Sequence, residues 1–188
     1  MLALSACATR PTPPSTLPQA KTEQSHQTNL ANIKSFALKG RLGVVTQKQG
    51  FSGGINWQHK TNFDNIDIYS PLGGKVANIA KDSSGVTLIS QDGQNIHAQD
   101  AESLTLKALG FKLPLTGLSD WVLGKASAGK IDAMSTDELG RLKALKQDGW
   151  DISYENYAES YGVALPNKIL LKSEQVNLKI IIEKWLDH

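Results

Sequence analysis

The sequence is poor in cysteine, in net charge and in long apolar runs, and each shortage excludes a class of protein. Cys7 is the only cysteine among 188 residues, which excludes intramolecular disulfides and cysteine-rich metal sites. Lys and Arg number 20 against 18 Asp and Glu, so the net charge is only +2 and nucleic acid is not an expected partner. No stretch reaches the roughly 18 apolar residues of a membrane-spanning helix. Membrane attachment would therefore require a lipid or a small apolar protrusion.

Catalytic and metal-binding motifs are also missing from the sequence. The four histidines lie far apart, without HExxH spacing, and no Gly-x-Ser-x-Gly motif occurs. Gly53-Gly54 and Gly73-Gly74 lack the Lys-Ser/Thr pair and the helix of a phosphate-binding loop. Paired glycines within strands more often mark bends that let a sheet curl. We therefore expect no enzyme, no cofactor and no metal site.

The segment Leu4-Ser5-Ala6-Cys7 has the pattern of a lipobox, in which two small residues precede a cysteine that receives a lipid thioether. It predicts that residues 1–6 are the remnant of a lipoprotein signal peptide and that the mature chain begins at a lipid-bearing Cys7. Residues 1–4 are only the tail of an apolar signal region. We therefore expect either a start further upstream or a trimmed chain. The alternative is a free cysteine in a disordered tail.

A change in composition predicts the domain boundary. Residues 8–29 contain four prolines and few large apolar side chains, so they cannot bury enough surface to offset the entropy cost of ordering. We expect residues 7–29 to form the lipidated N-terminus and a flexible tether. Residues 30–188 are long enough for one domain with a core of its own.

From Ile33 onward, apolar and polar residues alternate with a period of two, which is typical of half-buried strands. Phe36 and Leu38 share one face, and Ile55 and Trp57 repeat the pattern in the next segment. Four shorter alternating segments follow, with hairpin signals at 82–85 and 91–94. Together they predict an antiparallel meander of about six strands.

Two short helices are predicted after the meander. One begins near Asp100 and contains Leu104 and Leu109, and the other contains Leu118 and Trp121. Both carry apolar residues on more than one face, so we expect them to cover an apolar surface.

Strands are predicted again at 150–155 and 176–182, whereas Leu139–Leu145 fits either a strand or a helix. The order of strands, helical insert and strands predicts a mainly β fold. We expect a strongly curved antiparallel sheet, an incomplete barrel, with helices across its concave side.

An apolar residue occupies the tip of a predicted turn. In Ser70-Pro71-Leu72-Gly73-Gly74, the proline and glycines favour a tight turn, which places Leu72 at the apex. An exposed leucine there forgoes about 1.5–3 kcal/mol of burial, which makes sense if the tip is sometimes buried in a bilayer or a partner. The alternative is that Leu72 folds back under the sheet.

In their order along the chain, these segments resemble the LolB family of outer-membrane lipoprotein receptors. The resemblance is carried by the lipobox ending at Cys7, Phe36–Leu42 on the first strand, Phe51 and Trp57 on the second, Pro71-Leu72-Gly73, Leu113–Gly124 in the helical insert, and a last strand ending near Trp185.

The resemblance implies an unclosed antiparallel β-barrel with an α-helical lid over an apolar cavity for acyl chains. It implies a lipid-anchored outer-membrane protein, facing the periplasm, that accepts lipoproteins from the carrier LolA and inserts them through the Pro71-Leu72-Gly73 loop. We expect a monomer. Alternation of apolar residues assigns the cavity wall to Phe36, Leu38, Ile55 and Trp57, and the lid to Leu104, Leu109, Leu118 and Trp121.

Three alternatives remain open on the sequence. Each proposed cavity residue fits an ordinary solid core equally well. The protein could bind lipid without transferring it, or it could be an accessory subunit of an envelope assembly machine whose curved sheet binds protein.

Overall fold

The computed structural model describes residues 17–109 and 112–186. Within them the helices are α1 (Leu17–Asn32), α2 (Ala101–Leu109) and α3 (Leu115–Val122). The strands before α2 are β1 (Phe36–Thr46), β2 (Gly50–Lys60), β3 (Phe63–Tyr69), β4 (Lys75–Asp82), β5 (Gly85–Ser90) and β6 (Asn95–Ala98). The strands after α3 are β7 (Ile131–Thr136), β8 (Leu142–Gln147), β9 (Trp150–Ser160), β10 (Val163–Lys172) and β11 (Val176–Leu186).

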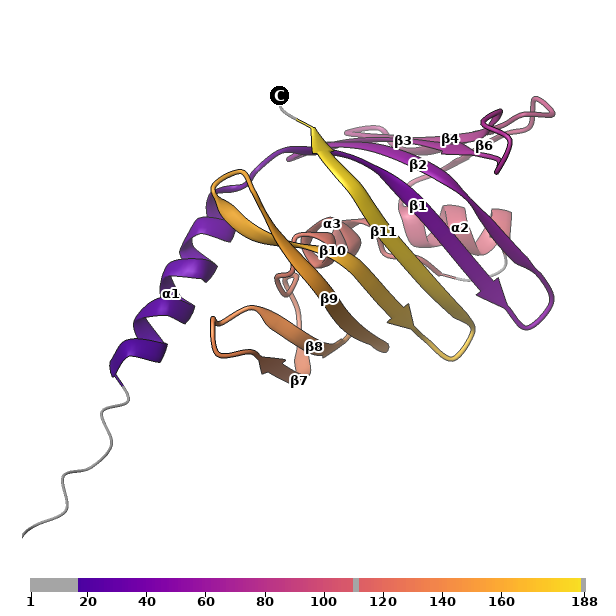
Figure 1. Cartoon of the computed structure of the whole chain (residues 1–188). Coiled ribbons are helices and arrows are strands. Elements are labelled where there is room, and N and C mark those ends of the chain that lie inside the picture. The colour runs from indigo at the N-terminus through magenta and orange to yellow at the C-terminus, as the bar shows by residue number, and fades with distance from the viewer. Residues whose placement is uncertain (1–16, 110–111, 187–188) are drawn as a thin grey trace, which may run out of the picture.

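The 11 strands form one antiparallel sheet in the order β6-β5-β4-β3-β2-β1-β11-β10-β9-β8-β7. The first six strands are the predicted meander, and the pairing of β1 with β11 joins it to the strands that follow the helices. In the described part of the chain, the edge strands β6 and β7 do not pair with each other. The sheet therefore curls without closing (Figure 1), which confirms the predicted incomplete barrel.

Glycines allow the backbones of neighbouring strands to approach closely where the sheet bends. A Cβ atom at Gly40 would collide with the carbonyl oxygen of Ile181, and one at Gly53 with that of Tyr69. The register also shifts between Lys39 and Gly40, and such bulges increase the local twist. A Cβ atom at either glycine would therefore require the neighbouring strand to shift.

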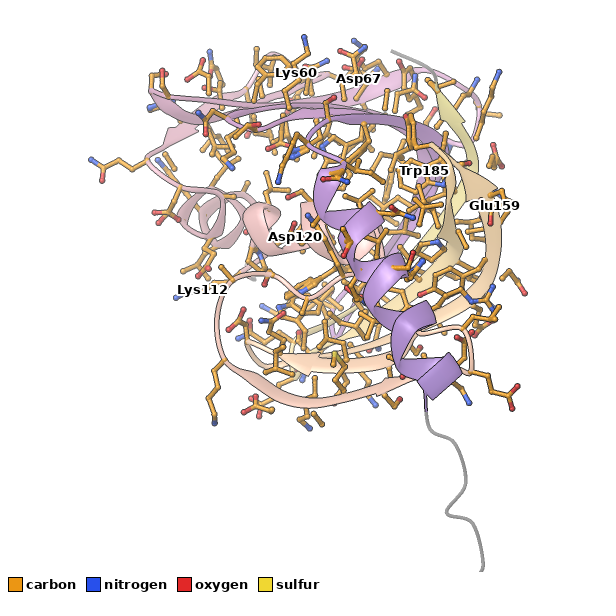
Figure 2. All side chains as sticks on the ribbon, turned by 90° about the vertical axis from the view of Figure 1, so that its left-hand side faces the viewer. Lys60, Asp67, Lys112, Asp120, Glu159 and Trp185 are labelled. Atoms are coloured by element: carbon orange, nitrogen blue, oxygen red, sulfur yellow. The ribbon has the colours of Figure 1, made fainter. Side chains whose placement is uncertain are left out.

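Helices α2 and α3 lie inside the curve of the sheet (Figure 1). Asp120 of α3 lies beneath the sheet, whereas Lys60 and Asp67 point away from it on the outer side (Figure 2). Leu104 of α2 and Trp121 of α3 have no exposed surface, as expected for helices that cover an apolar face. The core therefore lies between the concave face and these two helices.

Helix α1 differs from the expected tether. Residues 17–29 belong to a helix, and Leu30 near its end is fully buried. Pro18 is tolerated in the first turn of a helix, and the residues after it include good helix formers without glycine or proline. The expected tether up to residue 29 was based on the composition of residues 8–29 as a whole. The proline-rich residues before the helix dominated that composition and concealed the start of α1.

The ambiguous stretch Leu139–Leu145 is a turn followed by strand β8. Leu142 and Leu145 are both buried although they are three residues apart. The pairing of β8 with β7 skips Lys143, because the register shifts between Ser135 and Thr136. This irregularity lets both leucines face inward. Their spacing of three residues resembles that of a helix, but the bulge makes it compatible with a strand.

Burial of His26 couples the docking of α1 to pH. Among the described residues, its Nε2 atom has no hydrogen-bond partner. Burial, and after it the charge of Arg141, lowers the pKa of His26 below its usual 6.5, while Asp137 and Glu159 oppose the shift. The folded chain therefore binds this proton less readily than the unfolded chain. The contribution to stability is complete above pH 6.5 and is lost as the pH falls through the folded-state pKa.

We expect α1 to loosen as the pH falls below 6.5 and through the lowered folded-state pKa of His26, because the side chain then becomes charged. NMR spectra of the Leu30 methyl groups would follow docking, since this side chain is fully buried in the docked state. His26→Gln should remove the pH dependence, because glutamine stays neutral. His97→Gln, at an exposed position, is the matched control and should leave it intact. A Leu30 signal that is unchanged over this range would contradict the coupling.

Candidate functional site

An apolar cavity of about 390 Å³ lies between the concave face of the sheet and the helical segment. Strands β1 to β4 and β11 supply one wall, and α2, α3 and the segment between them supply the other. Most of the lining is aliphatic or aromatic, and it includes Leu42, Val44, Phe51, Ile55, Trp57, Ile66, Ile68, Val76, Ala77, Ile79, Leu113, Leu115, Leu118, Leu178 and Ile180. The volume lies in the range of roughly 300–1,000 Å³ typical of small-ligand sites.

Three of the residues expected to line a cavity do so, and four others belong to the core. Ile55, Trp57 and Leu118 line it. The remaining four are buried away from it: Phe36, Leu38, Leu104 and Trp121. Leu109 is the last residue of α2, and its side chain lies outside the described ones. Alternation therefore identified inward-facing residues without separating cavity from core.

Several lining residues were missed, although the sequence contained a signal for them. Ile66 and Ile68 on β3 and Leu178 and Ile180 on β11 occupy alternate, inward positions of strands that were predicted. The predicted cavity wall included only the first two strands, so these residues of β3 and β11 were left out of it. Thr105, which is also fully buried, carried no such signal.

A buried carboxylate fixes the indole ring of Trp57 in the cavity wall. Asp64 is 1% exposed, and its Oδ1 atom accepts a hydrogen bond of 2.9 Å from Nε1 of Trp57. The same oxygen lies 2.7 Å from Nδ1 of His59, and Nζ of Lys81 is 3.6 Å from Oδ2. Alternation places the side chains of His59, Asp64 and Lys81 on the same inward face as Ile55, Ile66 and Ile79. The sequence therefore contained a signal for this cluster.

Phe36 closes this end of the core by stacking on His59, with ring centroids 4.9 Å apart. It also meets Trp57 and Trp185 edge to face at 5.2 and 5.7 Å. Such pairs add about 0.5–1.5 kcal/mol beyond area burial. The aromatic cluster thus holds Trp57 from behind while its ring faces the cavity.

Gln147 joins the helical segment to strand β8. Its Oε1 atom accepts hydrogen bonds from Nε1 of Trp121 at 3.0 Å and from the backbone N–H of Ser127 at 3.0 Å. Its Nε2 atom donates to the carbonyl oxygen of Ser127 at 3.0 Å. Nearer the cavity, the hydroxyl of Thr105 accepts a 2.8 Å hydrogen bond from the backbone N–H of Leu113. The C-terminal end of α3 is therefore fastened to the sheet, and α2 to the segment that follows it.

Leu72 projects from the tip of the β3–β4 turn, where it is 98% exposed. Hydrogen bonds of 2.9 Å from the Gly73 N–H to the Ser70 carbonyl, and of 2.8 Å from the Ser70 N–H to the Gly74 carbonyl, close the turn. Gly73 has a φ of +88°, which favours glycine. The alternative in which Leu72 folds back under the sheet is therefore wrong.

The turn and the cavity lie at the same end of the molecule. Successive antiparallel strands reverse direction, so the β3–β4 turn lies at the end where the β1–β2 hairpin lies. The cavity lining includes Thr46, Gln49, Gly50 and Phe51 of that hairpin and Val76 just after the turn. Helix α1 lies at the opposite end (Figure 1).

In residues 17–109 and 112–186, no helix has both the length and the apolar character needed to cross a bilayer. Over the same ranges, no three His, Cys, Asp or Glu side chains are grouped as metal ligands would be. Cys7 lies outside these ranges.

The open curled sheet with helices on its concave face is shared with solved structures of other proteins. A LolA superfamily protein from Nitrosomonas europaea superimposes with a TM-score of 0.56 and 10% identity, covering 90% of this chain and 93% of that protein. A DUF1329 family protein from Desulfovibrio piger gives a TM-score of 0.55 at 5% identity, covering 89% and 92%. At such identities the likeness is one of fold.

The sequence defines the family within that fold. Residues 34–185 match the family described as outer membrane lipoprotein LolB. The outer-membrane lipoprotein LolB of Nitrosomonas europaea is 37% identical over 161 residues, which cover 85% of this chain and 76% of that protein. The LolB of Azoarcus sp. is 32% identical over 183 residues, 97% of this chain and 89% of that protein. The chain belongs to the outer-membrane lipoprotein LolB family.

Asp64→Ala should destabilise the domain by about 2–4 kcal/mol, because it leaves buried donors of Trp57 and His59 without their acceptor. Urea unfolding would measure the loss. Asp67→Ala is the matched control, since Asp67 is 19% exposed and its ion pair with Lys75 lies at the surface. Its loss should stay below about 1 kcal/mol. Equal losses for the two variants would show that the buried network adds nothing to stability.

Proposed function

We propose that this chain accepts mature lipoproteins from a LolA-type periplasmic carrier and inserts them into the outer membrane, holding their acyl chains in the interior cavity between the two steps. The supporting observation is that an apolar cavity and the exposed Leu72 lie at one end of the open sheet, in a chain of the LolB family. The proposal includes a lipid anchor on Cys7, which precedes the described residues.

The cavity lining suits hydrocarbon chains. Each methylene group removed from water contributes about 0.8 kcal/mol, so an acyl chain needs an apolar site wherever it leaves a bilayer. Transfer runs in one direction if this cavity binds the chain more tightly than the carrier does and less tightly than the bilayer. No nucleotide or catalytic residue is required, and we propose a non-enzymatic receptor. Ile55, Trp57 and Leu118 would contact the chain, and Phe36 and Trp121 would support the wall from behind.

A single leucine suits a brief contact with a membrane. Burying Leu72 in hydrocarbon contributes about 1.5–3 kcal/mol, which is too little to anchor a protein but enough to bias its orientation. Because the cavity lies at the same end, insertion of Leu72 would bring bound acyl chains to the bilayer surface. Pro71 and Gly73 would hold the leucine at the apex of the turn.

Leu72→Glu should leave lipoprotein acquisition from the carrier unchanged and lower incorporation into vesicles by about tenfold or more, since a carboxylate does not enter hydrocarbon. Both steps can be followed with a radiolabelled lipoprotein and purified LolA-type carrier. Leu139→Glu is the matched control, because Leu139 is 52% exposed in another turn. Unchanged incorporation by Leu72→Glu would remove the loop from the mechanism and would favour a passive lipid binder.

Ala77→Phe should weaken binding of a fluorescent fatty acid, because the ring fills part of the cavity. Each methylene group excluded from the cavity lowers the affinity about fourfold. Ala80→Phe places the same ring on the outer face of β4, where Ala80 pairs with Asn65 and Thr87, and should have no such effect. If the wild-type protein bound no fatty acid, an accessory subunit that binds protein would be the better explanation.

A further inference from the structure

A groove of about 810 Å³ lies on the outer face of the sheet, next to the Leu72 turn. Ser70, Pro71 and Gly73 form one end of it, and strands β1, β2 and β11 form its floor and sides. The groove is separate from the acyl cavity, because Lys39, Arg41 and Gly43 face outward on β1 while the residues between them face the interior.

The floor of the groove is hollow because outward positions on adjacent strands lack side chains. Gly43 on β1 pairs with Ser52, and Gly54 on β2 pairs with Arg41 and Tyr69. A Cβ at Gly43 would have its nearest neighbour 3.7 Å away, at Cβ of Lys179. These glycines thus leave a depression beside the longer side chains of the neighbouring strands.

Cationic groups dominate this groove. Lys39, Arg41 and Lys179 line it together with a single carboxylate, that of Glu183. Arg41 and Glu183 form an ion pair of 3.0 Å, and both remain largely exposed. Among the described residues, no carboxylate forms an ion pair with Lys39 or Lys179.

Asp67, an acidic group on the same face of β3, is already paired. Asp67 lies 2.8 Å from Nζ of Lys75 and accepts a hydrogen bond from Asn78. Burial raises the pKa of Asp67, but these hydrogen bonds outweigh it and hold the pKa below the usual value. Asp67 therefore stays ionised and neutralised by Lys75, and the excess of positive charge in the groove persists.

We propose that this groove receives the phosphate group of an anionic phospholipid at the surface of the bilayer that Leu72 enters. The proposal rests on the delivery function proposed above, because it assumes contact of the turn with a membrane. When the leucine lies among acyl chains, the residues that flank it lie at the depth of the headgroups. A groove that begins at those residues and carries unpaired lysines then meets the lipid phosphates.

Local charge is needed for this attraction because the chain as a whole carries only +2. A lysine close to an anionic membrane surface increases partitioning roughly fivefold, and the effect declines with salt. Lys39 and Lys179 together would therefore increase it roughly 25-fold at low ionic strength. Leu72 and the groove then act together, one on the acyl layer and the other on the headgroups.

The test measures sedimentation of the full chain carrying Cys7→Ala with vesicles of phosphatidylcholine, alone or with phosphatidylglycerol. For the chain that carries only Cys7→Ala, we expect phosphatidylglycerol in the vesicles to increase binding to them. Added sodium chloride should reverse this increase. Lys39→Gln/Lys179→Gln should lose about 20-fold in binding to the anionic vesicles and little on phosphatidylcholine. Lys60→Gln is the matched control, because this exposed lysine is the last residue of β2, away from the groove residues Ser52 to Asn56. The variant should bind as the unsubstituted form does.

Three outcomes would overturn the proposal. The groove does not contact anionic lipid if vesicle binding is the same with and without phosphatidylglycerol, or if the double substitution leaves binding to anionic vesicles unchanged. Stronger displacement by sodium phosphate than by sodium chloride at equal ionic strength would indicate a site for a soluble phosphate compound. Weaker acquisition of lipoprotein from the carrier by the double variant, with unchanged vesicle binding, would assign the lysines to a protein partner. Failure of the wild-type protein to acquire lipoprotein at all would instead refute the proposed function.

Discussion

A single sheet that curls without closing has an apolar concave face that no second sheet covers. In this protein α2, α3 and the segment between them cover that face, and they do so unevenly. Around Leu104 and Trp121 the helices pack against the sheet as a solid core, whereas between Ile55 and Leu118 they leave about 390 Å³. The cavity therefore exists because the barrel is open and its cover is short.

Buried polar groups hold the structure on both sides of that cavity. Asp64 fixes Trp57 in the wall, and Gln147 fixes Trp121 and Ser127 behind the helices. A buried hydrogen bond adds only about 1 kcal/mol net, but an unpaired partner costs more, so such groups favour one arrangement over others. Between these fixed points, the hydroxyl of Thr105 in the cavity lining accepts a hydrogen bond from the backbone N–H of Leu113.

Period-two alternation and turn residues predicted the first six strands, β9, β11 and the open sheet, because these features depend on local sequence. Strands β7 and β10 were not predicted, and the turn placed Leu72 at its apex without deciding whether the side chain is exposed. The separation of cavity from core was not predictable in this way. Phe36 and Ile55 both face inward, and only the distance between sheet and helices decides which of them meets empty space. Helix α1 was missed because the proline-rich residues before it dominated the composition of residues 8–29. Strand β8 was ambiguous because a bulge at Lys143 changes the period of its buried residues. The inward position of Asp64, by contrast, was predictable, because it alternates with Ile66 and Ile68 on the inward face of β3.

The placement of α1 bears on how an anchored protein could use Leu72. Helix α1 lies at the end of the sheet opposite the β3–β4 turn (Figure 1), and both Leu72 and the lipid proposed on Cys7 would have to reach the membrane. If both reach one bilayer, either the residues before α1 must turn back along the domain or α1 must leave its site. On the part of α1 whose side chains are described, the buried residues are Leu30 and His26. Release of α1 would expose at least these two side chains to water.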